Sequence, residues 1–215
     1  MADLLVDVQS VPATPSAGQA VIFVDSTAKI LCTKDDTGLV HARSESGSTA
    51  AQGAGFATDT YVTGSSLVIP SFSMQARTLL QWTLSASKTG AGTATPIYVI
   101  RIGANQTTAD TARLTLTGPA QTAIADIGTL NIRVIVRSVG ASGVLQGTAW
   151  WNHRGTAANT TTSGTGFAND STGHVEGTAA GFDNSALGGQ FVGLSINGGT
   201  SASWTVTQVG IEAIW

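Results

Sequence analysis

The chain has little charge and a single cysteine, and each shortage excludes a class of protein. Charged residues make up 11% of its 215 residues, against about 25% in an average soluble domain. Its ten lysines and arginines are scattered without a basic run, so the sequence disfavours nucleic-acid binding. One cysteine cannot form an internal disulfide, and the place of Cys32 in an apolar run predicts a buried structural thiol.

Long apolar segments are also missing. No stretch approaches the roughly 20 apolar residues that cross a bilayer, so we expect no membrane association. Residues 1–5 lack the basic start and apolar core of a signal peptide, and we therefore expect synthesis in a cytoplasm. No window has the i, i+3, i+4, i+7 apolar pattern of an amphipathic helix, which predicts little helix.

The sequence lacks the common catalytic and metal-binding motifs. His41, His153 and His174 stand far apart, with no HExxH or other close pairing. No GxSxG pentapeptide marks a nucleophile elbow, and no glycine-rich phosphate loop is present. Glu176 and Asp183 could serve as a glycosidase pair only at a separation that sequence does not fix. The sequence therefore predicts a protein that is not an enzyme and that needs no metal or cofactor.

What the chain does have is the pattern of a β-rich protein. It is 42% hydrophobic and holds 26 glycines, which together with low charge favours tight turns and extensive subunit contacts. Apolar residues alternate over 80–84, 113–117 and 130–136, which predicts strands with one buried face. Pro96–Ile102 is almost wholly apolar, which predicts a strand covered on both faces or lying at a subunit contact.

Roughly eight such strands, separated by turns, predict an all-β fold: an antiparallel β-sandwich of the jelly-roll type. The last strand has one irregularity. Trp204 and Val206 share one parity, whereas Val209 and Ile211 share the other. A strand keeps one face in the core only if an extra residue absorbs this change, so we predict a β-bulge near Gln208–Gly210.

Residues 1–45 are predicted to form a separate β-meander, because three short apolar runs alternate with turn residues. Two or three short strands are marginal alone, so this module must pack on the rest of the chain, on copies of itself or on another protein. We predict a linker at 46–55 and the sandwich at 56–215. The residues expected to contact a capsid or other subunits are Val21, Ile22, Phe23, Val24, Ile30 and Leu31.

The chain resembles structural proteins of tailed bacteriophages. Residues 15–42, PSAGQAVIFVDSTAKILCTKDDTGLVHA, have the Pro-x-x-Gly opening, short apolar strand, Asp-rich turn and second strand of a module in those proteins. Residues 81–116, 121–140 and 193–215 resemble a β-sandwich domain of phage head fibres, spikes and decoration proteins. The resemblance implies a virion protein, a homotrimer anchored on the capsid by its N-terminal module and released by lysis. Such proteins share no active site, so no catalytic residue carries over.

A function of a different class stays open: a glycan-binding adhesin of the tail or of a head spike. Trp150 and Trp151 put one indole on each face of a strand, so one should be core and the other should face solvent, a sugar or a neighbouring subunit. The predicted site for host polysaccharide comprises Trp151, His153, Arg154 and the polar segment 155–181.

Overall fold

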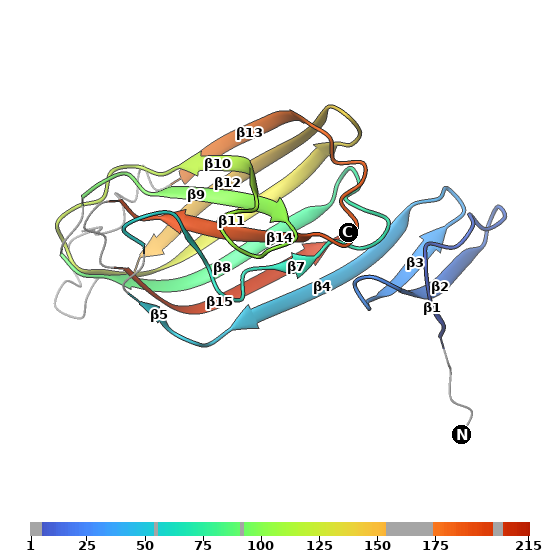
Figure 1. The fold of residues 1–215 in the computed structure, drawn as a ribbon, viewed down its shortest axis with the longest axis horizontal. Coiled ribbons are helices and arrows are strands. Elements are labelled where there is room, and N and C mark those ends of the chain that lie inside the picture. The colour runs from blue at the N-terminus through green and yellow to red at the C-terminus, as the bar shows by residue number, and fades with distance from the viewer. Residues whose placement is uncertain (1–5, 54–55, 91–92, 154–173, 200–203) are drawn as a thin grey trace, which may run out of the picture.

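The computed structural model describes residues 6–53, 56–90, 93–153, 174–199 and 204–215, which form strands and connecting loops without a helix (Figure 1). Accordingly, no helix in these residues could cross a membrane. The strands of the N-terminal half are β1 (Val8–Gln9), β2 (Ala20–Asp25), β3 (Leu31–Asp35), β4 (Val40–Ser48), β5 (Gln52–Gly53), β6 (Thr60–Tyr61), β7 (Leu67–Val68) and β8 (Leu79–Lys88). Those that follow are β9 (Ile97–Gly103), β10 (Thr111–Thr117), β11 (Asp126–Ser138), β12 (Gly143–His153), β13 (His174–Phe182), β14 (Phe191–Asn197) and β15 (Trp204–Ile214).

The strands form two sheets that face each other. The larger sheet has the order β1-β2-β3-β4-β15-β8-β11-β12-β13, with β5 also paired to β15. The smaller has the order β10-β9-β14-β6, with β7 also paired to β14. Between β4 and β15 the chain crosses repeatedly from one sheet to the other, which gives the predicted antiparallel jelly roll. The β12–β13 hairpin widens the larger sheet beyond β11, and β1–β3 widen it beyond β4.

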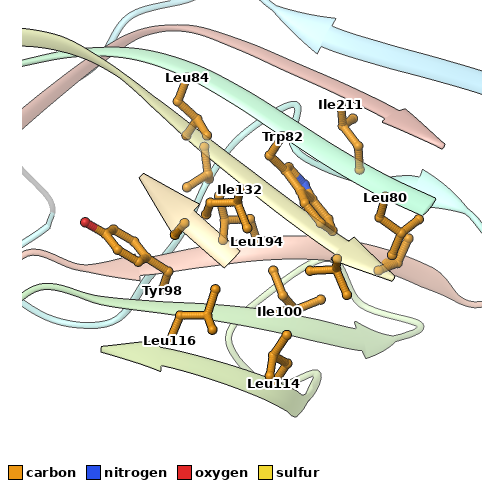
Figure 2. Packing of buried hydrophobic residues seen from close by; sticks show 14 of the residues in the cluster. Leu80, Trp82, Leu84, Tyr98, Ile100, Leu114, Leu116, Ile132, Leu194 and Ile211 are labelled. Carbon is orange, nitrogen blue, oxygen red and sulfur yellow. The ribbon is translucent and has the colours of Figure 1, made fainter. Parts of the chain in front are cut away.

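The core lies between the sheets and is filled by the side chains that the alternation predicted. Figure 2 shows Leu80, Trp82 and Leu84 of β8 pointing toward Ile100 of β9 and Leu194 of β14. The indole of Trp82 donates to the Ser65 carbonyl at 2.7 Å, so its polar atom is satisfied within the core.

Strand β9 is covered on both faces by the chain itself, which is the first of the two alternatives predicted for residues 96–102. Tyr98 and Ile100 face the core, while Val99 on the opposite face is only 7% exposed. Arg101, the one charged residue of this strand, pairs with Asp59 and donates to the Asp110 carbonyl at 2.7 Å. The loops of the chain itself therefore cover this face, and no subunit contact is needed to explain the apolar run.

The predicted bulge in the last strand is present. The register of β15 against β8 shifts between Val206 and Gln208, which leaves Thr207 as the extra residue. The shift lets Val206 and Val209 both point into the core, although their parities differ.

The predicted linker differs from the observed structure. Strand β4 is continuous: residues 40–42 pair with β3, and residues 43–48 pair with β15 of the sandwich. Residues 52–53 form β5, which also pairs with β15. The small polar residues of this stretch suggested a flexible connection, but their backbone groups complete the edge of β15. The meander and the sandwich thus share one strand.

Side chains fix the position of the meander further. Asp25 is fully buried, and its carboxylate accepts hydrogen bonds from the backbone N–H groups of Thr27 and Ala28 and from Ser71 of the sandwich. The Gln75 amide bonds the backbone N–H and carbonyl of Val40, at 3.3 and 2.7 Å. These contacts hold the meander as a projection from one end of the sandwich (Figure 1).

Candidate functional site

The two faces of the meander differ in what covers them. On the inner face Phe23, Cys32 and Val40 form a small apolar cluster that also contacts Phe72 of the sandwich. Burial raises the pKa of the Cys32 thiol to about 11, so the thiolate that would react is not formed near neutral pH. The prediction of a buried structural thiol is confirmed.

The outer face of the meander is apolar and exposed. Val8, Val24 and Leu31 are neighbours across β1, β2 and β3, and Ile22 lies on the same face of β2. Val8, Ile22 and Leu31 are 55%, 56% and 61% exposed, and Val24 is half-buried. We call these four residues the outer apolar face. Nothing within the described part of the chain packs over it closely enough to bury it.

Only part of the predicted contact set lies on this face. Ile22, Val24 and Leu31 belong to it, whereas Phe23 has no exposed surface and so cannot meet a partner. Val21 shares the inner face with Phe23, and Ile30 packs against both apolar clusters. The prediction treated each apolar run as a unit, although successive side chains of a strand point to opposite faces. Val8 was missed because a strand of two residues leaves no periodic signal.

A second apolar row continues on the sandwich beside the meander. Leu79 is paired with Ile135 on one side and with Ile214 on the other. Ile135 and Ile214 are 40% and 47% exposed. Arg43 of β4 follows Ile214 in the same row and forms an ion pair with Glu212 at 2.7 Å. The apolar outer surface is therefore not confined to the meander.

Farther along the sandwich the outer face of the same sheet becomes polar and hollow. An open depression of about 540 Å³ lies over β4, β15 and β8. Its lining residues are Glu45, Ser46, Gly47, Gln81, Thr83, Gly210, Ile211 and Glu212. Two glycines, Gly47 and Gly210, stand at paired positions on neighbouring strands, so this part of the sheet lacks side chains.

The predicted glycan site needs a correction at Trp151. This indole is 7% exposed, donates to the Tyr98 hydroxyl at 2.8 Å and packs edge-on against Trp204 at 5.5 Å. It is a core residue and cannot stack on a sugar. Trp150 is the half-buried partner on the outer face. The sequence held the signal, since Gln146 and Thr148 share the parity of Trp150.

Most of the remaining predicted glycan residues lie outside the described part of the chain. His153 is the last residue of β12, and Arg154 lies outside the described residues. Of the segment 155–181, residues 155–173 lie outside them too, and residues 174–181 belong to β13, which pairs with β12.

Two aspartates cap turns, whereas Glu176, which the sequence offered as a glycosidase partner of Asp183, is an exposed residue of β13. Asp35 accepts hydrogen bonds from the Thr37 hydroxyl at 2.7 Å and from the imidazole of His41 at 3.2 Å, and these bonds lower its pKa to about 2. Asp183 accepts from the Ser185 hydroxyl at 2.6 Å, which lowers its pKa as well. Among the described residues, no three His, Cys, Asp or Glu side chains are grouped so as to hold a metal ion.

The fold defines the chain as a jelly-roll β-sandwich protein with an N-terminal β-extension. No protein-family model matches it. The search of curated proteins finds no match either. Among solved structures, it is similar to the CBM2 module of the evolved Dit of Lactobacillus casei BL23 phage J-1, with 10% identity and a TM-score of 0.21. That likeness covers 63% of this chain and 62% of the other, and a TM-score of this size supports no conclusion about function.

Proposed function

We propose that the chain is a non-enzymatic structural protein of a tailed-phage virion that attaches to the particle through its outer apolar face. The observation that carries this proposal is the exposure of Val8, Ile22 and Leu31 on one face of the meander. Soluble proteins rarely leave contiguous apolar surface uncovered unless it meets a partner. Together with the half-buried Val24, these side chains supply the apolar centre that a stable interface requires.

The position of this face suits attachment. The meander projects from one end of the sandwich (Figure 1), and β4 runs without interruption from one to the other. A partner bound to the meander would therefore hold the sandwich in a defined orientation away from the attachment point. Asp25 and Gln75 stiffen the same junction.

The resemblance of residues 15–42 to phage structural proteins supports a virion partner, and the jelly roll is a fold of viral capsid proteins, an analogy at the level of fold. The finer proposal is a homotrimer that decorates or protrudes from the capsid. Three weak contacts that act together bind far more tightly than one, so a small apolar face on each chain would suffice. In this proposal the protein is made in the host cytoplasm and leaves with the virion on lysis.

A double variant tests the attachment. Ile22→Asp with Leu31→Asp places two carboxylates on the outer apolar face without touching the inner cluster. We expect the full-length variant to stay folded but no longer to cosediment with phage particles that lack the chain. Removing residues 1–45 is a poorer test, because it would strip part of β4 from β15.

The matched control is Ile127→Asp, which changes a side chain of similar exposure, 50%, on the outer face of β11. It should bind particles like the unmodified chain. Cosedimentation of the double variant at the unmodified level would show that the outer apolar face is not the attachment surface. Light scattering on the same samples distinguishes contact with the capsid from contact between copies of the chain. If the double variant no longer forms the proposed trimer, the face mediates self-association. If the trimer is retained while particle binding is lost, the face contacts the capsid.

A further inference from the structure

One row of residues crosses the outer face of the sandwich at the depression. Trp150 of β12, Asn131 of β11 and Thr83 of β8 are cross-strand neighbours, and the row continues through Gly210 to Gly47. Neighbouring strands lie about 4.8 Å apart, so the row is about 19 Å long. An indole thus stands at one end of a polar row, and a hollow without side chains stands at the other.

Close packing requires a glycine at one of these two positions but not at the other. A Cβ on Gly47 would lie 2.7 Å from the Val209 carbonyl oxygen, so close packing requires this glycine. A Cβ on Gly210 would meet only the Thr83 carbonyl oxygen, at 3.9 Å, and its backbone is not in the left-handed region. Glycine weakens a strand interior, yet nothing in the fold requires it at this position. The open space above Gly210 is therefore a feature that packing does not explain.

The charges beside the row nearly balance, with one carboxylate in excess. Glu45 and Glu212 face each other across β4 and β15, and Arg43 forms its ion pair with Glu212. Glu212 also lies opposite Gln81 of β8, and Gln81 lies opposite Arg133 of β11, so these residues form a second row beside the first. The same row continues through Thr148 of β12 to the exposed Glu176 of β13. Three carboxylates and two guanidinium groups leave a net charge of −1 there, so the surface offers no attraction to a strongly anionic ligand.

We propose that this row binds a segment of neutral polysaccharide, and we call it the glycan row: Trp150, Asn131, Thr83, Gly210 and Gly47. The C–H face of a sugar ring would stack on the indole, which has a large apolar face. The Thr83 hydroxyl donates to the Asn131 side-chain oxygen at 3.4 Å, which leaves the Asn131 NH2 group as a donor and the Thr83 oxygen as an acceptor for sugar hydroxyls. Gln81 adds a second amide at the depression. The open floor at Gly210 admits a further ring. This inference goes beyond the attachment function, because it uses a different part of the sheet.

Native gel electrophoresis of the full chain through gels containing dextran, mannan or hydroxyethyl cellulose tests the proposal. We expect at least one of these neutral polymers to retard the chain. Trp150→Ala should weaken the apparent affinity about tenfold or more, equivalent to about 1.4 kcal/mol. Gly210→Val should weaken it at least as much by filling the hollow. Ile127→Ala, which truncates an exposed side chain elsewhere on the same face, should leave retardation unchanged.

Thermal unfolding of each variant separates loss of binding from loss of fold. Trp150→Ala and Gly210→Val should melt within a few degrees of the unmodified chain. No retardation in any of the three neutral gels, retardation by an anionic polymer such as alginate alone, or retardation that survives both variants would overturn the proposal. Loss of particle cosedimentation on Trp150→Ala would also overturn it, because the row would then be a protein contact.

Discussion

The meander and the sandwich present two unlike outer surfaces on one continuous sheet. On the outer face of β1–β3 the large exposed side chains are Val8, Ile22 and Leu31. Over β4, β15, β8 and β11 most are hydroxyl, amide and charged groups around Gly47 and Gly210, with Ile127, Ile135 and Ile214 as apolar exceptions. The inner faces do not differ in this way, since both are apolar and buried. The comparison shows that the inner face determines the fold, while the outer face is free to differ and so holds the information about partners.

The adjacent tryptophans give the largest contrast between buried and exposed faces. Trp151→Ala would open a cavity beside Trp204 and leave the Tyr98 hydroxyl without its donor, and we expect it to lower the free energy of unfolding by about 3–5 kcal/mol. Trp150→Ala should cost about 1 kcal/mol or less, because that side chain is only half-buried. Denaturant unfolding of both variants checks this. Equal losses would contradict the assignment of the two rings to opposite faces.

The junction between the two regions should be the next most sensitive place. Asp25→Asn keeps the shape of the side chain but removes the charge that four neighbouring donors share. We expect a loss of about 2 kcal/mol, since hydrogen bonds to a charged group are the stronger ones. Hydrogen exchange should show faster exchange in β2 and β3 and little change in β9. Equally faster hydrogen exchange throughout the chain would mean that Asp25 stabilises the whole fold and not the junction alone.

The two glycines of the outer face should respond in opposite directions. Gly47→Val would force a Cβ against the Val209 carbonyl oxygen, and we expect it to destabilise the chain by about 1–3 kcal/mol. Gly210→Val meets open space and adds a residue that favours strands, so we expect a gain of up to about 1 kcal/mol. Thermal melts of the two variants provide the measurement. A loss at Gly210 as large as that at Gly47 would show that packing requires both.

The smallest expected effect concerns pH. Hydrogen bonds from Thr37 and His41 lower the folded pKa of Asp35 from 3.8 to about 2. The stabilisation is therefore present above the unfolded pKa and is lost as the pH falls from about 4 through about 2. Asp35→Asn should reduce the pH dependence of unfolding in that window, and Asp36→Asn serves as the neighbouring comparison. An unchanged profile would show that the turn does not hold the Asp35 carboxylate.

Sequence periodicity predicted strands such as β8 and β11 because each has one buried face, whereas β9, which is covered on both faces, was predicted from its continuous apolar run. Leu80, Trp82 and Leu84 alternate with polar neighbours, and the parity change before Val209 located the bulge to within a few residues. The continuity of β4 was not predictable, because its serines and Gly47 have the composition of a loop and are ordered only by pairing with a strand 160 residues later in the chain.

The candidate sites were predicted less well than the fold. Periodicity shows that the adjacent Trp150 and Trp151 point to opposite faces of the strand. It does not show which of the two faces the second sheet covers. For the same reason, Phe23 was predicted to contact a partner although its side chain lies on the buried face. The glycan row escaped sequence analysis altogether, because its members come from five strands and meet only through their register.

Immunogold electron microscopy of intact phage particles, with an antibody against the sandwich, tests attachment through the outer apolar face most directly. Particles assembled with the unmodified chain are compared with particles assembled with the Ile22→Asp, Leu31→Asp double variant. The proposed function predicts gold on the heads of the first and none on the second. Equal labelling of both would contradict attachment through this face, and no label on either would contradict the assignment to the virion.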